Sequence, residues 1–145
     1  MSSHSKEEIA RLSAKAMWEE DNASQGLGME LVSVAPGHAV IAMTITKAMT
    51  NGHGTCHGGY IFTLADSAFA FACNSHGQRA VAQHCSVSFI APGRLGMRLI
   101  AEGIERQRSE RSGITDVTVR DDAGNIIAEF RGNSRTVPGS LLPAE

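Results

Sequence analysis

The stretch that decides the fold is residues 57–75, HGGYIFTLADSAFAFACNS. After two glycines it places apolar residues on nearly every face of a helix, at Ile61, Leu64, Ala65, Ala68, Phe69 and Ala72. A surface helix keeps a polar face, whereas a helix that is apolar all round lies in the protein interior. The pattern therefore predicts a buried helix over residues 57–75, which the following SHGQ segment ends with Gly77 suited to the C-cap.

One carboxylate interrupts this apolar segment. Between Lys47 and Arg79, Asp66 is the only Asp, Glu, Lys or Arg in the sequence. Burying a carboxylate costs free energy unless a partner offsets its desolvation, and desolvation raises its pKa. Asp66 is therefore either a structural carboxylate bonded to Ser67, Asn74 or the backbone, or a base or nucleophile that works near neutral pH.

The segments on either side of this helix are predicted from periodicity and turn residues. Residues 6–21 have apolar side chains at helical spacing and predict an amphipathic helix, which the NASQGLG segment ends. Alternating side chains and turn sequences predict strands at 29–35, 38–46, 79–90, 96–108, 112–120 and 125–137. One buried helix followed by consecutive strands predicts an α+β fold, in which a curved antiparallel sheet wraps the helix. We expect residues 1–145 to form this single domain.

Composition excludes several classes of function. A chain of 145 residues is long enough for one domain with a core, and a formal charge of −2 gives no general attraction to nucleic acid or anionic membranes. The polar, acidic start of the sequence contains no apolar signal core, and no segment is long and apolar enough to span a bilayer. The odd number of cysteines, three, favours reduced thiols. We therefore expect a cytoplasmic protein.

The two glycines at the start of the helix are suited to bind an oxygen anion. The first N–H groups of a helix have no intrahelical partner and carry partial positive charge. Because glycine has no Cβ, Gly58 and Gly59 let a ligand oxygen approach these groups closely, as the developing oxyanion of an attacked carbonyl would. The structural alternative is that the same glycines only allow close packing of the helix on the sheet.

Polar residues flank the glycines. Asn51 is a candidate to hold the preceding loop or to polarise a carbonyl, and His57 is a candidate to orient a substrate or to donate a hydrogen bond. The structural alternatives are an asparagine in a turn and a histidine beside the N-cap of the helix. Cys56 is an alternative nucleophile beside His57. We expect no metal site among the histidines and cysteines.

Three segments, NGHGTCHGGYIFTLADSAFAFACN, SVSFIAPGRLG and GNIIAEFRGNS, together resemble the phenylacetic-acid-degradation (PaaI-type) thioesterases of the hotdog-fold superfamily. The resemblance covers about residues 26–136. It implies the hotdog fold, with a long central helix wrapped by a curved antiparallel β-sheet. It also implies hydrolysis of acyl-CoA thioesters, above all of phenylacetyl-CoA and its ring-hydroxylated relatives. No cofactor is implied, because coenzyme A is part of the substrate.

The resemblance also implies roles for single residues. By position in the family's pattern, Gly58 supplies the oxyanion N–H and Asp66 is the nucleophile or the general base. Asn51 and His57 shape the site beside the thioester.

Further residues are expected to bind the substrate: Gly59, Arg94 and Arg111. The two arginines are predicted on turns and strand ends. They are either ordinary solvated charges or lie where a phosphate-bearing ligand can reach them. Aromatic residues of the helix are expected to narrow the acyl cavity and to favour arylacetyl over palmitoyl groups, namely Tyr60, Phe62, Phe69 and Phe71.

Two alternative functions remain open from the residues alone. One is a hotdog acyl-CoA hydratase or dehydratase, in which Asp66 and His57 would form the acid–base pair. The other is a non-catalytic acyl-CoA-binding protein that uses the same pocket.

Helix geometry predicts that the site is shared between two chains. Gly58 and Asp66 are eight residues apart, so about 12 Å separate them along the helix axis at about 1.5 Å per residue. An oxyanion donor and an attacking carboxylate must both lie within roughly 3 Å of the reacting atoms. Two antiparallel helices related by a two-fold axis bring Gly58 of one chain to Asp66 of the other. We therefore expect a homodimer with two shared active sites. A dimer of dimers is a separate expectation, which this helix geometry does not supply.

Overall fold

A computed structural model describes residues 4–143 of the chain. The helices are α1 (Lys6–Glu20), α2 (Asn22–Gly26), the short 3-10 helix η1 (Lys47–Met49) and α3 (Gly58–Cys73). The strands are β1 (Glu30–Ala35), β2 (His38–Thr44), β3 (Gln78–Phe89), β4 (Arg98–Arg108), β5 (Ser112–Arg120) and β6 (Ile126–Ser140). Among the described helices, none combines the length and the apolar character that a membrane crossing requires.

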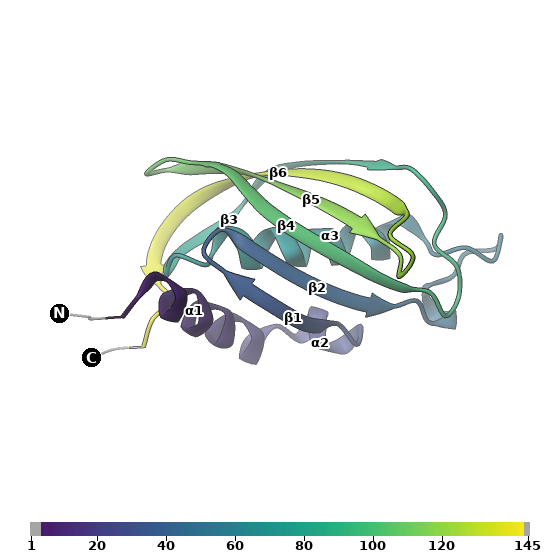
Figure 1. The fold of residues 1–145 in the computed structure, drawn as a ribbon, viewed down its shortest axis with the longest axis horizontal. Helices are drawn as coiled ribbons and strands as arrows, with labels where there is room; N and C mark the ends of the chain where they lie inside the picture. The colour runs from purple at the N-terminus through teal and green to yellow at the C-terminus, as the bar shows by residue number, and fades with distance from the viewer. Residues whose placement is uncertain (1–3, 144–145) are drawn as a thin grey trace.

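The six strands form one antiparallel sheet in the order β1-β2-β4-β5-β6-β3. The sheet curves around α3 (Figure 1), while α1 and α2 lie beside β1 outside this wrap. The predicted fold class, α+β with one long helix inside a curved antiparallel sheet, is confirmed. The order leaves β3 at one edge of the sheet and β1 at the other.

Glycines in the sheet let α3 lie close against it. A Cβ at Gly103 of β4 would lie 2.8 Å from the Ala68 carbonyl oxygen, and a Cβ at Gly132 of β6 would lie 2.5 Å from the Phe69 ring. Leu64, Ala65 and Ala68 are accordingly fully buried at the centre of the core. The apolar periodicity of residues 57–75 thus reflects the side of the helix that packs on the sheet, whereas the side with Thr63, Asp66 and Ala70 is only half-buried.

The sequence did not predict α2, because NASQGLG carries the residues that end a helix. The chain does leave α1 there, but Asp21 then caps a new helical turn. Its Oδ1 accepts a hydrogen bond from the Ser24 N–H at 2.9 Å, which satisfies one of the free N–H groups at the start of α2. The connection between β2 and α3 likewise contains the 3-10 turn of η1, which no pattern in the sequence predicted.

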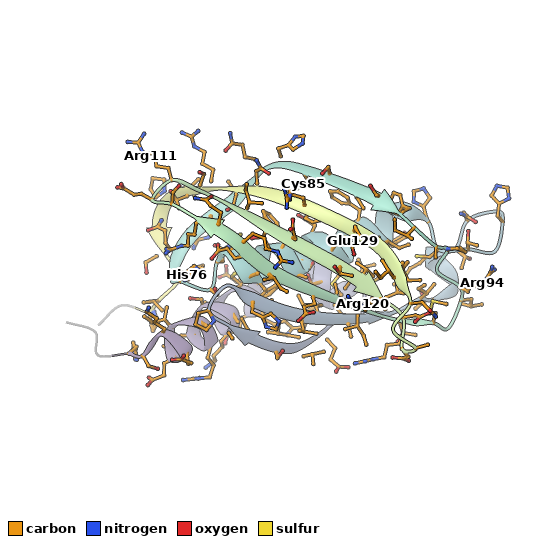
Figure 2. All side chains as sticks on the ribbon, turned by 45° about the horizontal axis from the view of Figure 1, so that its top comes forward. His76, Cys85, Arg94, Arg111, Arg120 and Glu129 are labelled. Carbon is orange, nitrogen blue, oxygen red and sulfur yellow. The ribbon has the colours of Figure 1, made fainter. Side chains whose placement is uncertain are left out.

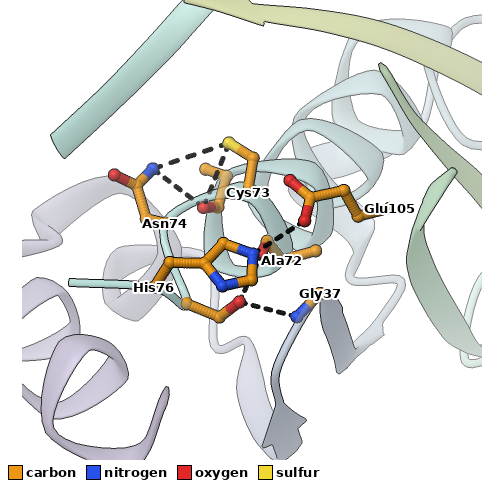
Figure 3. A network of polar contacts seen from close by, with 8 residues as sticks. Gly37, Ala72, Cys73, Asn74, His76 and Glu105 are labelled. Carbon is orange, nitrogen blue, oxygen red and sulfur yellow. Dashed lines mark hydrogen bonds and ion pairs between the residues drawn. The ribbon is translucent and has the colours of Figure 1, made fainter. Parts of the chain in front are cut away.

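Buried polar contacts hold the C-terminal end of α3 (Figure 3). The Ser75 hydroxyl donates to the Ala72 carbonyl and accepts from the Gly37 N–H, both at 2.7 Å. His76 Nε2 lies 2.7 Å from Glu105 Oε1 on β4, and the Glu105 side chain is only 8% exposed. These contacts fix the junction between α3 and β3 against the β1–β2 turn and the sheet.

We expect Glu105→Ala to lower the free energy of unfolding by about 1–3 kcal/mol, because it leaves the His76 ring without its buried partner. Glu102→Ala is the matched control, since Glu102 makes an equally short contact with His38 but is 39% exposed. The control should cost less than about 1 kcal/mol. Urea unfolding of both variants measures the difference, and equal losses would contradict a special role for the buried pair.

Candidate active site

Among the described residues, the backbone N–H of Gly58 at the N-terminal end of α3 is free. His57 is the N-cap, and its Nδ1 accepts a hydrogen bond from the Gly59 N–H at 2.9 Å. The Tyr60 N–H donates to the His57 carbonyl at 3.0 Å. Within residues 4–143 the Gly58 N–H has no hydrogen-bond partner. The Gly58 N–H, unlike the Gly59 N–H, is therefore not used by a described residue and is available to a ligand. Because Nδ1 is an acceptor, a neutral His57 ring carries its proton on Nε2.

The Asn51 side chain uses its oxygen to close the loop before α3. Its Oδ1 accepts hydrogen bonds from the His53 N–H at 2.8 Å and from the Thr55 N–H and hydroxyl at 3.3 and 3.2 Å. Its amide nitrogen has no hydrogen-bond partner in the described part of the chain. The oxygen thus holds the loop, and the NH₂ group remains able to donate to a substrate.

An apolar groove of about 380 Å³ opens at the same end of α3. It is lined by Cys56, Gly58, Ile61, Phe89, Ile90, Ala91, Pro92 and Gly93. The Phe89 ring lies over Gly58 so closely that a Cβ on Gly58 would be 2.9 Å from Phe89 Cζ. Phe89 and Ile90 are 53% and 59% exposed, which is unusual for large apolar side chains. The groove thus places an apolar surface directly beside the free N–H.

The expectation that Phe69 and Phe71 narrow the acyl cavity is wrong. Both side chains are 1% exposed and belong to the core, where Phe69 packs against Phe130 and Phe71 against Trp18. The aromatic wall of the groove is Phe89, at the end of β3. The signal for it in the sequence was an apolar pair, Phe89 and Ile90, directly before the APG turn.

The thiol of Cys56 is a poor candidate nucleophile. Burial raises its pKa, so it is protonated at neutral pH, and its Sγ lies 3.5 Å from the His57 carbonyl oxygen. Among residues 4–143 no group of three or more His, Cys, Asp or Glu side chains is arranged to hold a metal ion.

Asp66 is a partly buried carboxylate without a hydrogen bond from any described residue. Its expected structural partners are engaged elsewhere: Ser67 contacts Ser24, and Asn74 bonds to backbone groups. Burial raises the pKa of Asp66, and the negative charge of Asp21 raises it further. A carboxylate in this state is suited to accept a proton near neutral pH.

One chain brings most of the predicted site residues together but not all of them. Arg94 lies at the N-terminal end of α3, where its backbone pairs with Thr55, whereas Arg111 lies in the β4–β5 turn at the opposite end of the molecule (Figure 2). Asp66 is two helical turns from Gly58, about 12 Å along the axis. The residues gathered at the N-terminal end of α3 are Asn51, His57, Gly58, Gly59 and Arg94.

Comparison with known proteins gives one consistent result. Residues 53–128 match the thioesterase superfamily. The chain is 41% identical over 128 residues to the acyl-coenzyme A thioesterase PaaI of Escherichia coli, which covers 88% of this chain and 91% of that protein. The solved structure of E. coli PaaI superimposes with a TM-score of 0.92 at 40% identity, over 94% of this chain and 99% of the other. A Streptococcus mutans protein solved with acetyl-CoA bound matches at 28% identity and a TM-score of 0.73, over 75% of this chain and 88% of that one.

Proposed function

The chain belongs to the thioesterase superfamily, and from this membership we propose that it hydrolyses acyl-CoA thioesters to a free acid and CoA. The resemblance to PaaI-type thioesterases is confirmed by the relative at 41% identity and by the structural match. At the site itself, the proposal is carried by the free Gly58 N–H at the start of a buried helix, beside an apolar groove.

The proposed reaction uses the Gly58 N–H and the Asp66 carboxylate. The thioester carbonyl oxygen accepts a hydrogen bond from the Gly58 N–H, which together with the helix dipole stabilises the developing oxyanion. Asp66 either takes a proton from an attacking water or attacks the carbonyl carbon itself to form a mixed anhydride, which water then opens. In both routes the C–S bond breaks and CoA leaves as a thiolate. We propose that no metal or cofactor takes part.

We further propose that two subunits share each site. Strand β3 is an edge strand of twelve residues, most of them exposed, so its free N–H and C=O groups are available to pair with another strand. Two-fold pairing of β3 with its copy would extend the sheet and set the two α3 helices antiparallel. Gly58 of one subunit would then face Asp66 of the other. The dimer of dimers stays a prediction.

The same pairing would also allow the two predicted arginines, which lie far apart in one chain, to bind one substrate. Arg94 lies at the N-terminal end of α3 and Arg111 at the opposite end of the chain. Antiparallel helices would therefore bring Arg94 of one subunit and Arg111 of the other to the same end of the dimer. Their contact with the phosphates of CoA stays a prediction.

For the acyl group, we propose an arylacetyl group held in the groove against Phe89. Two observations support this choice: the similar E. coli PaaI protein comes from a phenylacetic acid degradation operon, and the lining of the groove is apolar. We expect Phe89→Ala to lower kcat/KM for phenylacetyl-CoA about tenfold, through lost ring contact, and to change kcat/KM for acetyl-CoA much less. The wild-type protein should prefer arylacetyl-CoA to palmitoyl-CoA.

Leu95→Ala is the matched control for this prediction. Leu95 is another large apolar side chain, 58% exposed, but it does not line the groove. Release of free CoA, followed with a thiol reagent over a panel of acyl groups, gives each kcat/KM. Equal losses in the two variants, or an unchanged ratio of phenylacetyl to acetyl turnover in Phe89→Ala, would contradict the placement of the acyl group.

The same assay tests the reaction class. A thioesterase releases thiol from phenylacetyl-CoA, a hydratase consumes enoyl-CoA without releasing thiol, and an acyl-CoA-binding protein does neither. We propose a cytoplasmic location, which the three free thiols support.

A further inference from the structure

A chain of hydrogen bonds connects the α1–α2 junction to the residue next to Asp66. Asp21 Oδ2 accepts a hydrogen bond from the Ser24 hydroxyl at 2.6 Å, and Ser24 Oγ lies 2.8 Å from Ser67 Oγ. Ser24 is 1% exposed, whereas Asp21 and Ser67 are half-buried, so Ser24 is the buried link of this chain. Asp21 is further fixed by its bond from the Ser24 N–H. The chain ties residues 21–24 to α3 at the position of its carboxylate.

The direction of the bonds follows from the chemistry of the groups. An ionised carboxylate only accepts, so the single Ser24 hydroxyl proton points to Asp21. The oxygen of Ser24 is therefore the acceptor in the contact with Ser67, and the Ser67 proton points to Ser24. The hydroxyl nearest to Asp66 in sequence thus does not donate to it, which agrees with the absence of a hydrogen bond to Asp66 from residues 4–143.

We propose that Asp21 is a positioning residue of the active site, which turns the Ser24 and Ser67 hydroxyls away from Asp66 and holds a second negative charge beside it. The inference rests on the proposed function, in which Asp66 is the base or nucleophile. It gives the N-terminal segment, which contributes nothing to the groove, a role in the reaction.

The electrostatic surroundings of Asp66 support this assignment. After burial, the charge of Asp21 is the second cause that raises the pKa of Asp66. Besides burial, the charge of Asp66 acts in turn on two thiols and raises their pKa, Cys85 on β3 and Cys73 on α3 itself. Burial raises the pKa of both thiols, that of Cys73 to about 12, so neither is charged at neutral pH. Asp21 is therefore the charged side chain that acts on Asp66 within the described chain.

The sign of the effect on activity follows directly. Asp66 must be ionised to act, so activity falls as pH drops through its raised pKa. Removing the Asp21 charge removes one cause of the increase, so the pKa of Asp66 falls. The acidic limb of the pH profile then moves to lower pH, and the weaker base lowers kcat on the plateau.

The test is the pH profile of kcat/KM and kcat for phenylacetyl-CoA in Asp21→Asn. Asparagine is as good an N-cap as aspartate, so α2 should form. We expect the acidic limb at lower pH and a several-fold lower kcat on the plateau. Ser67→Ala keeps the Asp21 charge but removes the hydrogen bond between Ser24 and α3. The acidic limb of this variant should also move to lower pH, by less than in Asp21→Asn. Asp21→Ser, also an N-cap without charge, repeats the test should the asparagine variant not fold.

Glu20→Gln is the matched control. It removes an adjacent exposed carboxylate on α1 that is outside the hydrogen-bond chain, and its acidic limb should stay at the wild-type pH. The assignment of Asp21 would be overturned if the acidic limb of Asp21→Asn or Asp21→Ser stayed at the wild-type pH, or if Glu20→Gln shifted it equally. The proposed function would still stand in that case, provided that the wild-type protein releases thiol. Absence of thiol release by the wild-type protein would instead reject the proposed function.

Discussion

Asp66→Asn is expected to lower kcat at least about a hundredfold, in the range that loss of a general base produces, while the protein still folds. The amide keeps the shape of the side chain but neither accepts the proton of water nor attacks the thioester. Steady-state release of CoA measures the effect. Turnover near the wild-type value would mean that Asp66 is a structural residue and that the proposed site is wrong.

The same substitution should not weaken the fold at neutral pH. Burial raises the pKa of Asp66 above its unfolded value, so its contribution to stability is present below the unfolded pKa and is lost as pH rises through the folded pKa. An ionised Asp66 is thus a cost at neutral pH that asparagine removes. At pH 7 we expect the melting temperature of Asp66→Asn to equal or exceed that of the wild type. This difference in melting temperature should disappear at about pH 3, below the usual aspartate pKa.

Asp116→Asn is a control of opposite sign. The hydrogen bonds from Arg131 lower the pKa of Asp116, so its contribution to stability is present above the unfolded pKa and is lost as pH falls. This variant should lose stability at neutral pH and keep its kcat. If both substitutions changed the melting temperature in the same direction, our account of Asp66 as a functional carboxylate that burial destabilises would be wrong.

Mixing two inactive variants is expected to restore activity to about a quarter of the sites, by two-fold symmetry. Asn51→Ala opens the loop that Asn51 Oδ1 closes beside Gly58, and Asp66→Ala removes the carboxylate. In a mixed dimer, one site takes Asn51 and Gly58 from the Asp66→Ala chain and Asp66 from the other chain, so it is intact. The second site contains both lesions. Random pairing makes half of all dimers mixed, which leaves one site in four intact.

The measurement is turnover per subunit after co-expression or joint refolding, with exchange verified by two different tags. Each variant alone should be strongly impaired, so recovery toward a quarter of wild-type turnover is a large signal. A site within one chain could not recover, because every chain carries a lesion. Turnover no higher than the mean of the two variants, with exchange proven, would exclude the shared site.

The central helix and its carboxylate were predictable from local sequence. The apolar residues of 57–75 recur at helical spacing, and helix α3 occupies Gly58–Cys73. Asp66 stood out as the only charge of its segment, and two glycines marked the start of the helix. The strands were predictable from the alternation of apolar and polar residues and from the turn residues between them. Each of these signals depends on residues within a few positions of one another, where backbone geometry relates spacing directly to structure.

The tertiary structure alone decided which groups meet. Helical spacing did not reveal that the His57 ring folds back on the Gly59 N–H and leaves the Gly58 N–H free, because that depends on the path of the loop before α3. It placed Phe69 and Phe71 on the helix but could not tell that they face the core, while the groove takes its aromatic wall from Phe89.

The charge that acts on Asp66 was equally hidden in the sequence. Asp21 is 45 residues earlier in the chain, in a segment that reads only as a helix end. It reaches the neighbourhood of Asp66 because Asp21 caps α2 and Ser24 then packs against Ser67 on α3. Sequence by itself determined the helix, its glycines and its lone carboxylate, since these follow from short-range periodicity. Packing between distant segments decided three further features: the free N–H of Gly58, the Phe89 wall of the groove and the Asp21 charge that acts on Asp66. No local pattern in the sequence encodes such packing.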